Sequence, residues 1–464
     1  MLRRNLTPWF IGVVLLLSAA ITMLIAGYSS LNQAEAAKKR GEYPLAAERY
    51  ANAATYLFWR DDLYEQAGIS AALAGDFPSA IEFFITTPIS TEEGWMWHCT
   101  AHITQEDFEA AATVCSEGAR LHDSAVLYRL LAHLHRTQKN WGGELAALAH
   151  QTRLDPADAY AAYRMGLLLT LYTPGEALAE LTRASQLNPE VDSAVQTLRA
   201  ALAVSAQRSD PSMQKVVIGQ AFGLVQDWEL AQAAFEQALD LDANNAEAWA
   251  WLGEAKQQTG QGGRAELDHA LLLNRESTNV RALRALYWSR QGKFEQMLAE
   301  YLIAAGIEPE NPRWRAGIAD AHAGMGDLVS ALAAYQRAVE LAPAFPDYWR
   351  MLAVFCADNN VQLEEIGLPA AQQAVLLAPG DVVTLDALGY VYLSSGRYAN
   401  AVEILLSVIE GSPEYYPAHI HLAMAYLAQG DRAAAYNILT FVRGSPTSGV
   451  YTKSAQELLD KYFP

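Results

Sequence analysis

Cysteine is scarce in this 464-residue sequence, which contains Cys99, Cys115 and Cys356. A number that is both small and odd excludes the disulfide framework of a small secreted domain. No Cys-x-x-Cys pair is present, so the common zinc and thiol-redox motifs are also missing. Cys99 and Cys115 stand at similar distances on the two sides of the predicted turn "QEDF". Two alternatives remain: free buried thiols, or a Cys99–Cys115 disulfide if the chain faces an oxidising compartment.

Positive charge is also in short supply. The chain has 33 Lys and Arg against 52 Asp and Glu, for a formal net charge of −19. An acidic surface repels the phosphates of nucleic acid, because that recognition depends on Lys and Arg. We therefore expect no nucleic-acid partner.

The sequence lacks the motifs that carry catalysis. "GQGGRA" at Gly260 imitates a dinucleotide-binding loop, but it joins two predicted helices and follows no strand. His98 and His102 are spaced i, i+4 on one predicted helix, yet a metal would need a third ligand and no HExxH is present. No phosphate loop or nucleophile elbow occurs. We expect no enzyme, no cofactor and no metal site.

One long apolar run stands near the N-terminus. Residues 9–28 contain no charge, are long enough for about 30 Å of helix, and are flanked by Trp9 and Tyr28 as interfacial anchors would be. An uncleaved membrane anchor and a cleaved signal peptide both fit, since Ala26 and Gly27 are small enough for cleavage. The run exceeds the apolar core of a signal peptide, and helix-forming sequence follows directly, which favours the anchor.

The flanking charges bear on membrane orientation. Arg3 and Arg4 favour a cytoplasmic N-terminus, whereas the cluster at 38–40 weighs against it from the other end. We expect a single-pass protein of the bacterial plasma membrane whose remaining chain is extracytoplasmic.

Most of the chain is repetitive. A small residue recurs about every 34 residues, a second follows about twelve later, and most repeats have a third about seven further on. Turn sequences such as "AGDF", "QGKF" and "SGRY" separate the first two. The first small positions are Ala34, Gly68, Cys99, Ala132, Gly166, Gly219, Gly253, Ala285, Ala319, Ala353, Gly389 and Ala423.

This pattern predicts pairs of helices that pack closely. The small residues lie where two helices press together, and prolines such as Pro309, Pro343 and Pro379 end the units because proline cannot continue a helix. With no β-rich segment, the predicted fold is all-α.

The pattern resembles the tetratricopeptide repeat. "WAWLGEAKQQTG" at Trp249 and "TLDALGYVYLSSG" at Thr384 match the first half of that repeat, and "ALAAYQRAVELAP" at Ala331 matches the second. The resemblance implies a right-handed superhelical solenoid of about twelve repeats after the membrane helix. It also implies a concave groove, formed by the first helices, that holds a peptide or protein partner. The family's basic clamp for a terminal carboxylate is missing, since Asp386 and Tyr390 occupy such positions here.

Helical phase identifies candidates for the groove. They are Trp97, Trp251, Tyr390, Ile420 and Met424. Two interpretations stay open: these residues pack against the next repeat, or they line the groove and anchor a ligand, as aromatic and Met side chains do at interfaces.

One interval breaks the period. From Gly166 to Gly219 the spacing exceeds a repeat by about one helix, so we expect a joint near residues 191–212. The expected organisation is a tail and transmembrane helix (1–28), a first array (29–190), an extra helix and junction (191–211), a second array (212–446) and a capping helix (447–464). The favoured function is a membrane-anchored scaffold for protein–protein interaction in bacterial envelope assembly. The alternatives are a binding module for a glycan or small effector, or a passive spacer.

Overall fold

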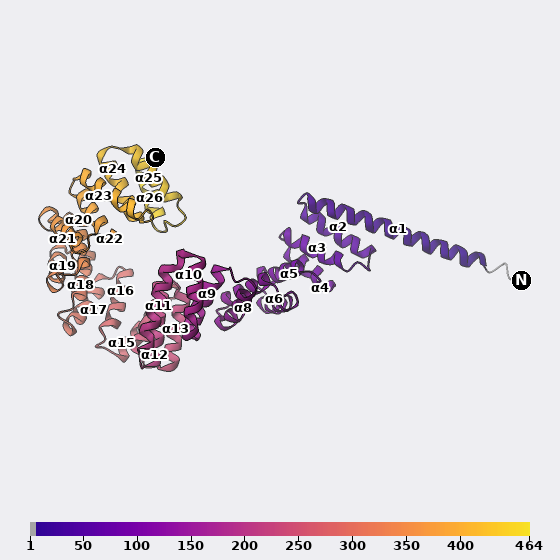
Figure 1. The fold of residues 1–464 in the computed structure, drawn as a ribbon, viewed down its shortest axis with the longest axis horizontal. Helices are drawn as coiled ribbons and strands as arrows, with labels where there is room; N and C mark the ends of the chain where they lie inside the picture. Colours follow the sequence, from indigo (N-terminus) through magenta and orange to yellow (C-terminus); the bar gives the residue numbers. More distant parts are fainter. Residues whose placement is uncertain (1–5) are drawn as a thin grey trace. The chain divides into compact units, whose positions relative to one another are not determined.

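The computed structural model describes residues 6–464, and the regular structure in that range is entirely helical (Figure 1). Arg3 and Arg4, on which the predicted orientation depends, lie outside the described residues. The prediction of an all-α array of helix–turn–helix repeats after one apolar N-terminal helix is confirmed.

The helices follow one another along the chain with short turns. The first are α1 (Leu6–Lys39), α2 (Tyr43–Tyr56), α3 (Asp62–Leu73), α4 (Phe77–Thr86), α5 (Glu92–Thr104), α6 (Phe108–His122), α7 (Ala125–Thr137), α8 (Trp141–Leu154), α9 (Ala159–Tyr172), α10 (Pro174–Leu187), the 3-10 turn η1 (Pro189–Val191), α11 (Asp192–Ala206), α12 (Pro211–Leu224) and α13 (Trp228–Leu241). The others are α14 (Ala246–Gln258), α15 (Arg264–Leu273), α16 (Thr278–Arg290), α17 (Phe294–Ile307), α18 (Pro312–Gly324), α19 (Leu328–Leu341), α20 (Pro346–Asn359), the π-helical turn η2 (Leu363–Gly367), α21 (Leu368–Leu377), α22 (Val382–Ser394), α23 (Tyr398–Gly411), α24 (Tyr416–Gln429), α25 (Arg432–Gly444) and α26 (Tyr451–Tyr462).

Side-chain caps fix many of the helix starts. The side chain of an Asp, Asn, Ser or Thr accepts a hydrogen bond from the backbone N–H three residues on, which satisfies a donor that the helix leaves free. The capping residues are Asp76, Thr91, Asp107, Ser124, Asn140, Asp158, Asn245, Ser277, Asp327, Asp381 and Asp431.

The small repeat positions form the seams between paired helices. Ala34, Ala319, Ala353 and Ala423 are fully buried. At Gly389 a Cβ would lie 2.7 Å from Cγ of Leu405, which itself is fully buried on the partner helix α23. The absence of a side chain at Gly389 therefore allows α22 and α23 to approach closely.

Helix α1 is one continuous element with two environments. Its apolar window, within Trp9–Lys39, has a mean hydropathy of 2.5, and the side chains from Trp9 to Ile25 are mostly exposed. Leu31, Ala34 and Ala37 are instead buried against α2. The helix is long and apolar enough to cross a membrane, and its second half is the first helix of the array.

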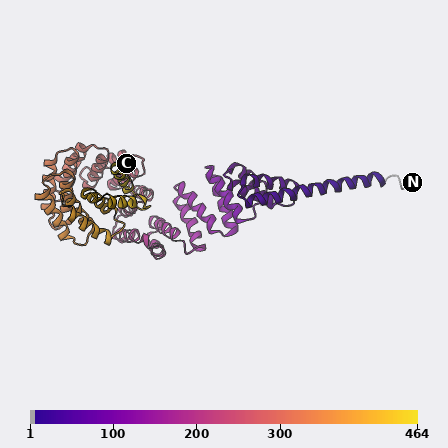
Figure 2. The same ribbon diagram turned by 90° about the horizontal axis from the view of Figure 1, so that it is seen from above.

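Two compact units divide the chain. One contains the residues up to Asp210 together with Val217–Leu230, and the other contains Pro211–Val216 and Ala231–Pro464. Helix α11 lies in the first unit, where it packs beside α10. In the second unit, successive helix pairs follow a curved path (Figure 2). The joint expected near residues 191–212 stays a prediction.

A π-helical turn explains one irregular interval. The spacing from Ala353 to Gly389 is about two residues longer than the common period, and Leu363–Gly367 forms a π-helical turn between them. The turn follows Asn360 and Gln362, both of which have positive φ. The surplus residues are thus accommodated between α20 and α21, and the phase of the next first helix, α22, is kept.

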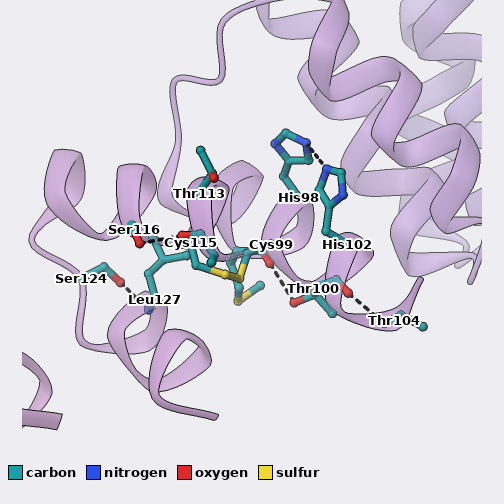
Figure 3. The surroundings of a disulfide bond; sticks show 12 residues. His98, Cys99, Thr100, His102, Thr104, Thr113, Cys115, Ser116, Ser124 and Leu127 are labelled. Atoms are coloured by element: carbon teal, nitrogen blue, oxygen red, sulfur yellow. Dashed lines mark hydrogen bonds between the residues drawn. A yellow bond between two sulfur atoms is a disulfide. The ribbon is translucent and has the colours of Figure 1, made fainter. Parts of the chain in front are cut away.

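The first unit contains a disulfide between Cys99 of α5 and Cys115 of α6 (Figure 3). The two Cα atoms are 5.1 Å apart, within the usual range for this bond, and both residues are fully buried. Cys356 is free and buried.

Beside the disulfide lie two buried imidazoles, His98 and His102, whose Nε2 atoms are 3.2 Å apart (Figure 3). Burial, and secondarily the neighbouring His102, lower the pKa of His98 to about 4. His102 also faces Asp107, at 3.3 Å from Nδ1 to the carboxylate. Within residues 6–464 no group of three or more His, Cys, Asp and Glu side chains is arranged to hold a metal.

The state of Cys99 and Cys115 can be measured by alkylation of the unfolded chain. We expect one alkylated cysteine, Cys356, when the protein is denatured without reductant, and three after reduction. Intact mass spectrometry counts the adducts. Three adducts without reductant would contradict the disulfide and weaken the extracytoplasmic assignment.

Candidate functional site: a pocket on three first helices

Helices α20, α22 and α24 are the first helices of three consecutive repeats and pack side by side. Their shared face lines a cavity of about 330 Å³, here called the first-helix pocket. Its apolar lining is Val354, Val383, Ala387, Ile420 and Met424, and its polar lining is Arg350, Asp358, Asp386, Tyr390, Tyr415 and His421.

Three of the five residues predicted from helical phase meet in this pocket. Tyr390 comes from α22, and Ile420 and Met424 come from α24. Ile420 is buried, while Tyr390 and Met424 are half-buried. The period of the repeat brings together residues that are about 30 positions apart in sequence.

The other two predicted residues lie elsewhere. Trp97 is half-buried and packs against the cluster that contains Ala80 and Phe84. Trp251 is half-buried and stacks on Phe235, with ring centroids 6.2 Å apart and planes 20° apart. Neither lines the first-helix pocket, and their contacts are those of packing between neighbouring helices.

A polar chain crosses all three helices of the pocket. The Tyr390 hydroxyl donates to Oδ1 of Asp358 at 2.8 Å, and its ring stacks on His421 with centroids 4.6 Å apart. Nδ1 of His421 lies 2.7 Å from Oδ1 of Asp386, so its N–H donates to that carboxylate. Asp358, Tyr390, His421 and Asp386 thus hold the three repeats in one register.

Both tyrosines of the pocket remain protonated at neutral pH. Burial raises the pKa of Tyr390 to about 12, with further contributions from its hydrogen bond to Asp358 and the charge of that carboxylate. Burial first, and the nearby Asp386 second, also raise the pKa of Tyr415. The pocket therefore presents two neutral hydroxyls among its carboxylates.

Arg350 supplies the pocket's cation. Its Nη2 lies 3.3 Å from Oδ1 of Asp347, an exposed carboxylate on the same helix. Its Nε is buried and has no hydrogen-bond partner in the described part of the chain. A buried donor without a partner costs about 1–3 kcal/mol, and a carbonyl or carboxylate oxygen of a ligand would remove that cost.

Arg350, Asp358 and His421 also line the pocket, although no pattern in the sequence singles them out. His421 belongs to the "HIH" stretch, where His419 turns inward and is buried. Asp386 was noted because it occupies a position at which the resembled family carries its clamp. A comparison of equivalent positions on consecutive first helices would have indicated an acidic site there.

Family comparison agrees with the repeat pattern. Tetratricopeptide-repeat models match residues 217–278, 281–360 and 392–440. These three segments of the chain are tetratricopeptide repeats. None of the curated proteins matches it in sequence.

Several solved structures are similar to the chain. Yeast Tom70 is 14% identical, with a TM-score of 0.43, covering 94% of this chain and 96% of its own. PilW, described as a type IV pilus biogenesis factor, is 18% identical, with a TM-score of 0.39, covering 45% of this chain and 96% of its own. PilF of Pseudomonas aeruginosa is 15% identical, with a TM-score of 0.37, covering 45% and 94%.

The polar chain can be tested through the pH dependence of stability. In the unfolded chain a tyrosine has a pKa of about 10. Because the folded pKa of Tyr390 is higher, its contribution to stability is fully present below about pH 10 and is lost as the pH rises through about 12. Tyr390→Phe removes this contribution, together with a hydrogen bond worth about 1 kcal/mol.

The expected result is a Tyr390→Phe chain that is less stable than the original below pH 9, with a gap that narrows between pH 10 and 12. Urea unfolding midpoints of both chains measure this difference in stability. Other tyrosines with a raised pKa, such as Tyr301, are present in both chains, so their contributions cancel in the comparison. A gap that is constant to pH 12 would contradict the bond to Asp358.

Proposed function

We propose that this protein is a membrane-anchored scaffold that captures an extended segment of another protein in the first-helix pocket. The observation that carries the proposal is the convergence of Tyr390, Ile420 and Met424 on one cavity lined by three consecutive repeats. The α1 helix, with its exposed apolar side chains, is the proposed single-pass anchor.

The chemistry of the pocket favours a particular kind of segment. Ile420, Met424 and Val354 offer an apolar floor for one side chain. Asp358 is exposed at the rim, and the pocket's one guanidinium, Arg350, is already paired with Asp347. The balance of charge favours a segment that places a basic residue beside an apolar one.

The backbone of such a segment also finds a partner. Arg350 lines the pocket with a side chain that is 28% exposed, and its guanidinium can donate to a peptide carbonyl, which fits an extended chain that lies across the helices. A glycan or small effector is the second candidate, because the stacked Tyr390 and His421 rings and the cavity volume would also suit a small ligand.

For localisation, we propose the bacterial plasma membrane with the array outside the cytoplasm. The support is the length and hydropathy of α1 together with the buried Cys99–Cys115 pair, since disulfides persist in oxidising compartments. A role in envelope assembly is the pathway we favour for such a scaffold.

Photo-crosslinking tests the capture of a protein segment. A benzophenone amino acid replaces Met424, and a matched chain carries it at Val329, which is 82% exposed on the second helix α19. We expect a protein adduct in membranes from position 424 and none from position 329. Asp358→Asn should lower the yield at position 424 about 3- to 10-fold, since a charge pair that helps binding contributes on the order of 1 kcal/mol.

The charge control is Glu403→Gln, which removes the same charge from the exposed face of the second helix α23. It should leave the adduct unchanged. Equal adducts at positions 424 and 329 would contradict the pocket as the binding surface. A chain that yields no protein adduct at position 424 would favour a small ligand.

A further inference from the structure

The connection between α2 and α3, residues 57–61, exposes two large aromatic side chains. Phe58 is 78% exposed and Trp59 is 50% exposed, with their rings edge to face at 5.2 Å between centroids. Tyr56, at the end of α2, is 39% exposed beside them. Exposed apolar side chains that gather into one patch are a mark of interaction sites. We call residues 56–60 the aromatic loop.

The aromatic loop is fixed against a particular point of α1. Leu57 is fully buried, and a Cβ at Gly27 would lie 2.6 Å from its Cγ. A Cβ there would also lie 3.1 Å from Cβ of Tyr56. Gly27 therefore gives α2 and the loop room to seat directly on the helix.

The electrostatics of Arg60 agree with this placement. The bidentate hydrogen bonds to Asp62 are the largest cause of the raised pKa of Arg60. Smaller electrostatic contributions come from Tyr28 and Glu35 on α1. The loop thus faces α1 near Gly27 and Tyr28, on the side from which the apolar half of the helix departs.

Near Gly27 and Tyr28, the side chains of α1 change from exposed to buried. Towards the N-terminus, side chains such as Ile21 (55% exposed) and Ile25 (66%) are apolar and uncovered. Towards the C-terminus, Leu31 and Ala34 are buried by α2. Tyr28, Tyr56 and Trp59 therefore gather at the boundary between the uncovered and the covered half of the helix.

We propose that the aromatic loop inserts into the lipid–water interface of the membrane that α1 spans, so that the first repeat is seated on the bilayer surface. The inference rests on the proposed membrane anchor. Tyrosine and tryptophan favour the interfacial zone, because their rings are apolar at one end and polar at the other. Arg60 and Asp62 supply charged groups that stay in the headgroup region.

A lipid surface fits better than a protein partner because the loop is continuous with the apolar surface of α1. An uncovered segment of about 30 Å requires acyl chains around it, and the loop lies where those chains end. A second attachment beside α1 would limit rotation of the array about the membrane helix.

Depth-dependent quenching tests the proposal in the full chain. Trp59→Cys, in a Cys356→Ala background, is labelled with a small environment-sensitive fluorophore and reconstituted in phosphatidylcholine vesicles. Nitroxide lipids quench the label from the headgroup or from deep in the acyl region. Circular dichroism verifies that each labelled chain is folded.

Two matched positions complete the experiment. Leu45→Cys lies on the first turn of α2, about 16 Å along the helix from Tyr56, and its side chain is 36% exposed. Ile21→Cys lies in the uncovered half of α1. We expect headgroup nitroxides to quench position 59 at least about threefold more than position 45, and deep nitroxides to quench position 21.

The outcomes separate the two proposals. Quenching at position 21 with equal, weak quenching at positions 59 and 45 overturns the seating of the loop and leaves the anchor intact. Absence of quenching at position 21 overturns the anchor and the loop together.

Discussion

The close approach of paired helices at alanine and glycine is the constraint from which the rest of this structure follows. A single helix pair cannot bury its apolar faces alone, so each repeat depends on contact with its neighbours. Ala319, Ala353 and Ala423 each place only a methyl group between the paired helices, and all three residues are fully buried. Larger side chains there would separate the helices and change the angle at which each repeat meets the next.

Because the small residues of the seam recur at the same position in each repeat, consecutive first helices turn nearly the same face in the same direction. Residues separated by about one repeat therefore become neighbours in space, as with Tyr390 and Asp358, 32 residues apart, and His421 and Asp386, 35 residues apart. The π-helical turn at Leu363–Gly367 preserves this relation where the repeat is longer. The first-helix pocket is thus a consequence of the period, and its chemistry is set by a few side chains that the seam leaves unconstrained.

Sequence periodicity could predict the helices, the seam and the inward phase of Tyr390, Ile420 and Met424, since all three depend on local rules of helix geometry. It could not distinguish these from Trp97 and Trp251, because the neighbour that each aromatic side chain meets depends on the stacking of whole repeats. The phase of Trp251 suits a groove, yet Phe235 on the preceding repeat already stacks against it. The aromatic loop was also missed, because its place beside Gly27 arises only when α2 folds back along α1.

The repeat period brings the consecutive first helices α20 and α22 into one shared face. The most direct measurement is intramolecular crosslinking of cysteines at Asp358 and Tyr390, whose side chains meet across α20 and α22, in a Cys356→Ala chain. A short bifunctional thiol reagent should join this pair within one chain, as read by peptide mass spectrometry. A control pair at Asp358 and Glu403, the latter exposed on α23, should not be joined. Equal crosslinking of both pairs, or failure of the first, would contradict this arrangement of the first helices.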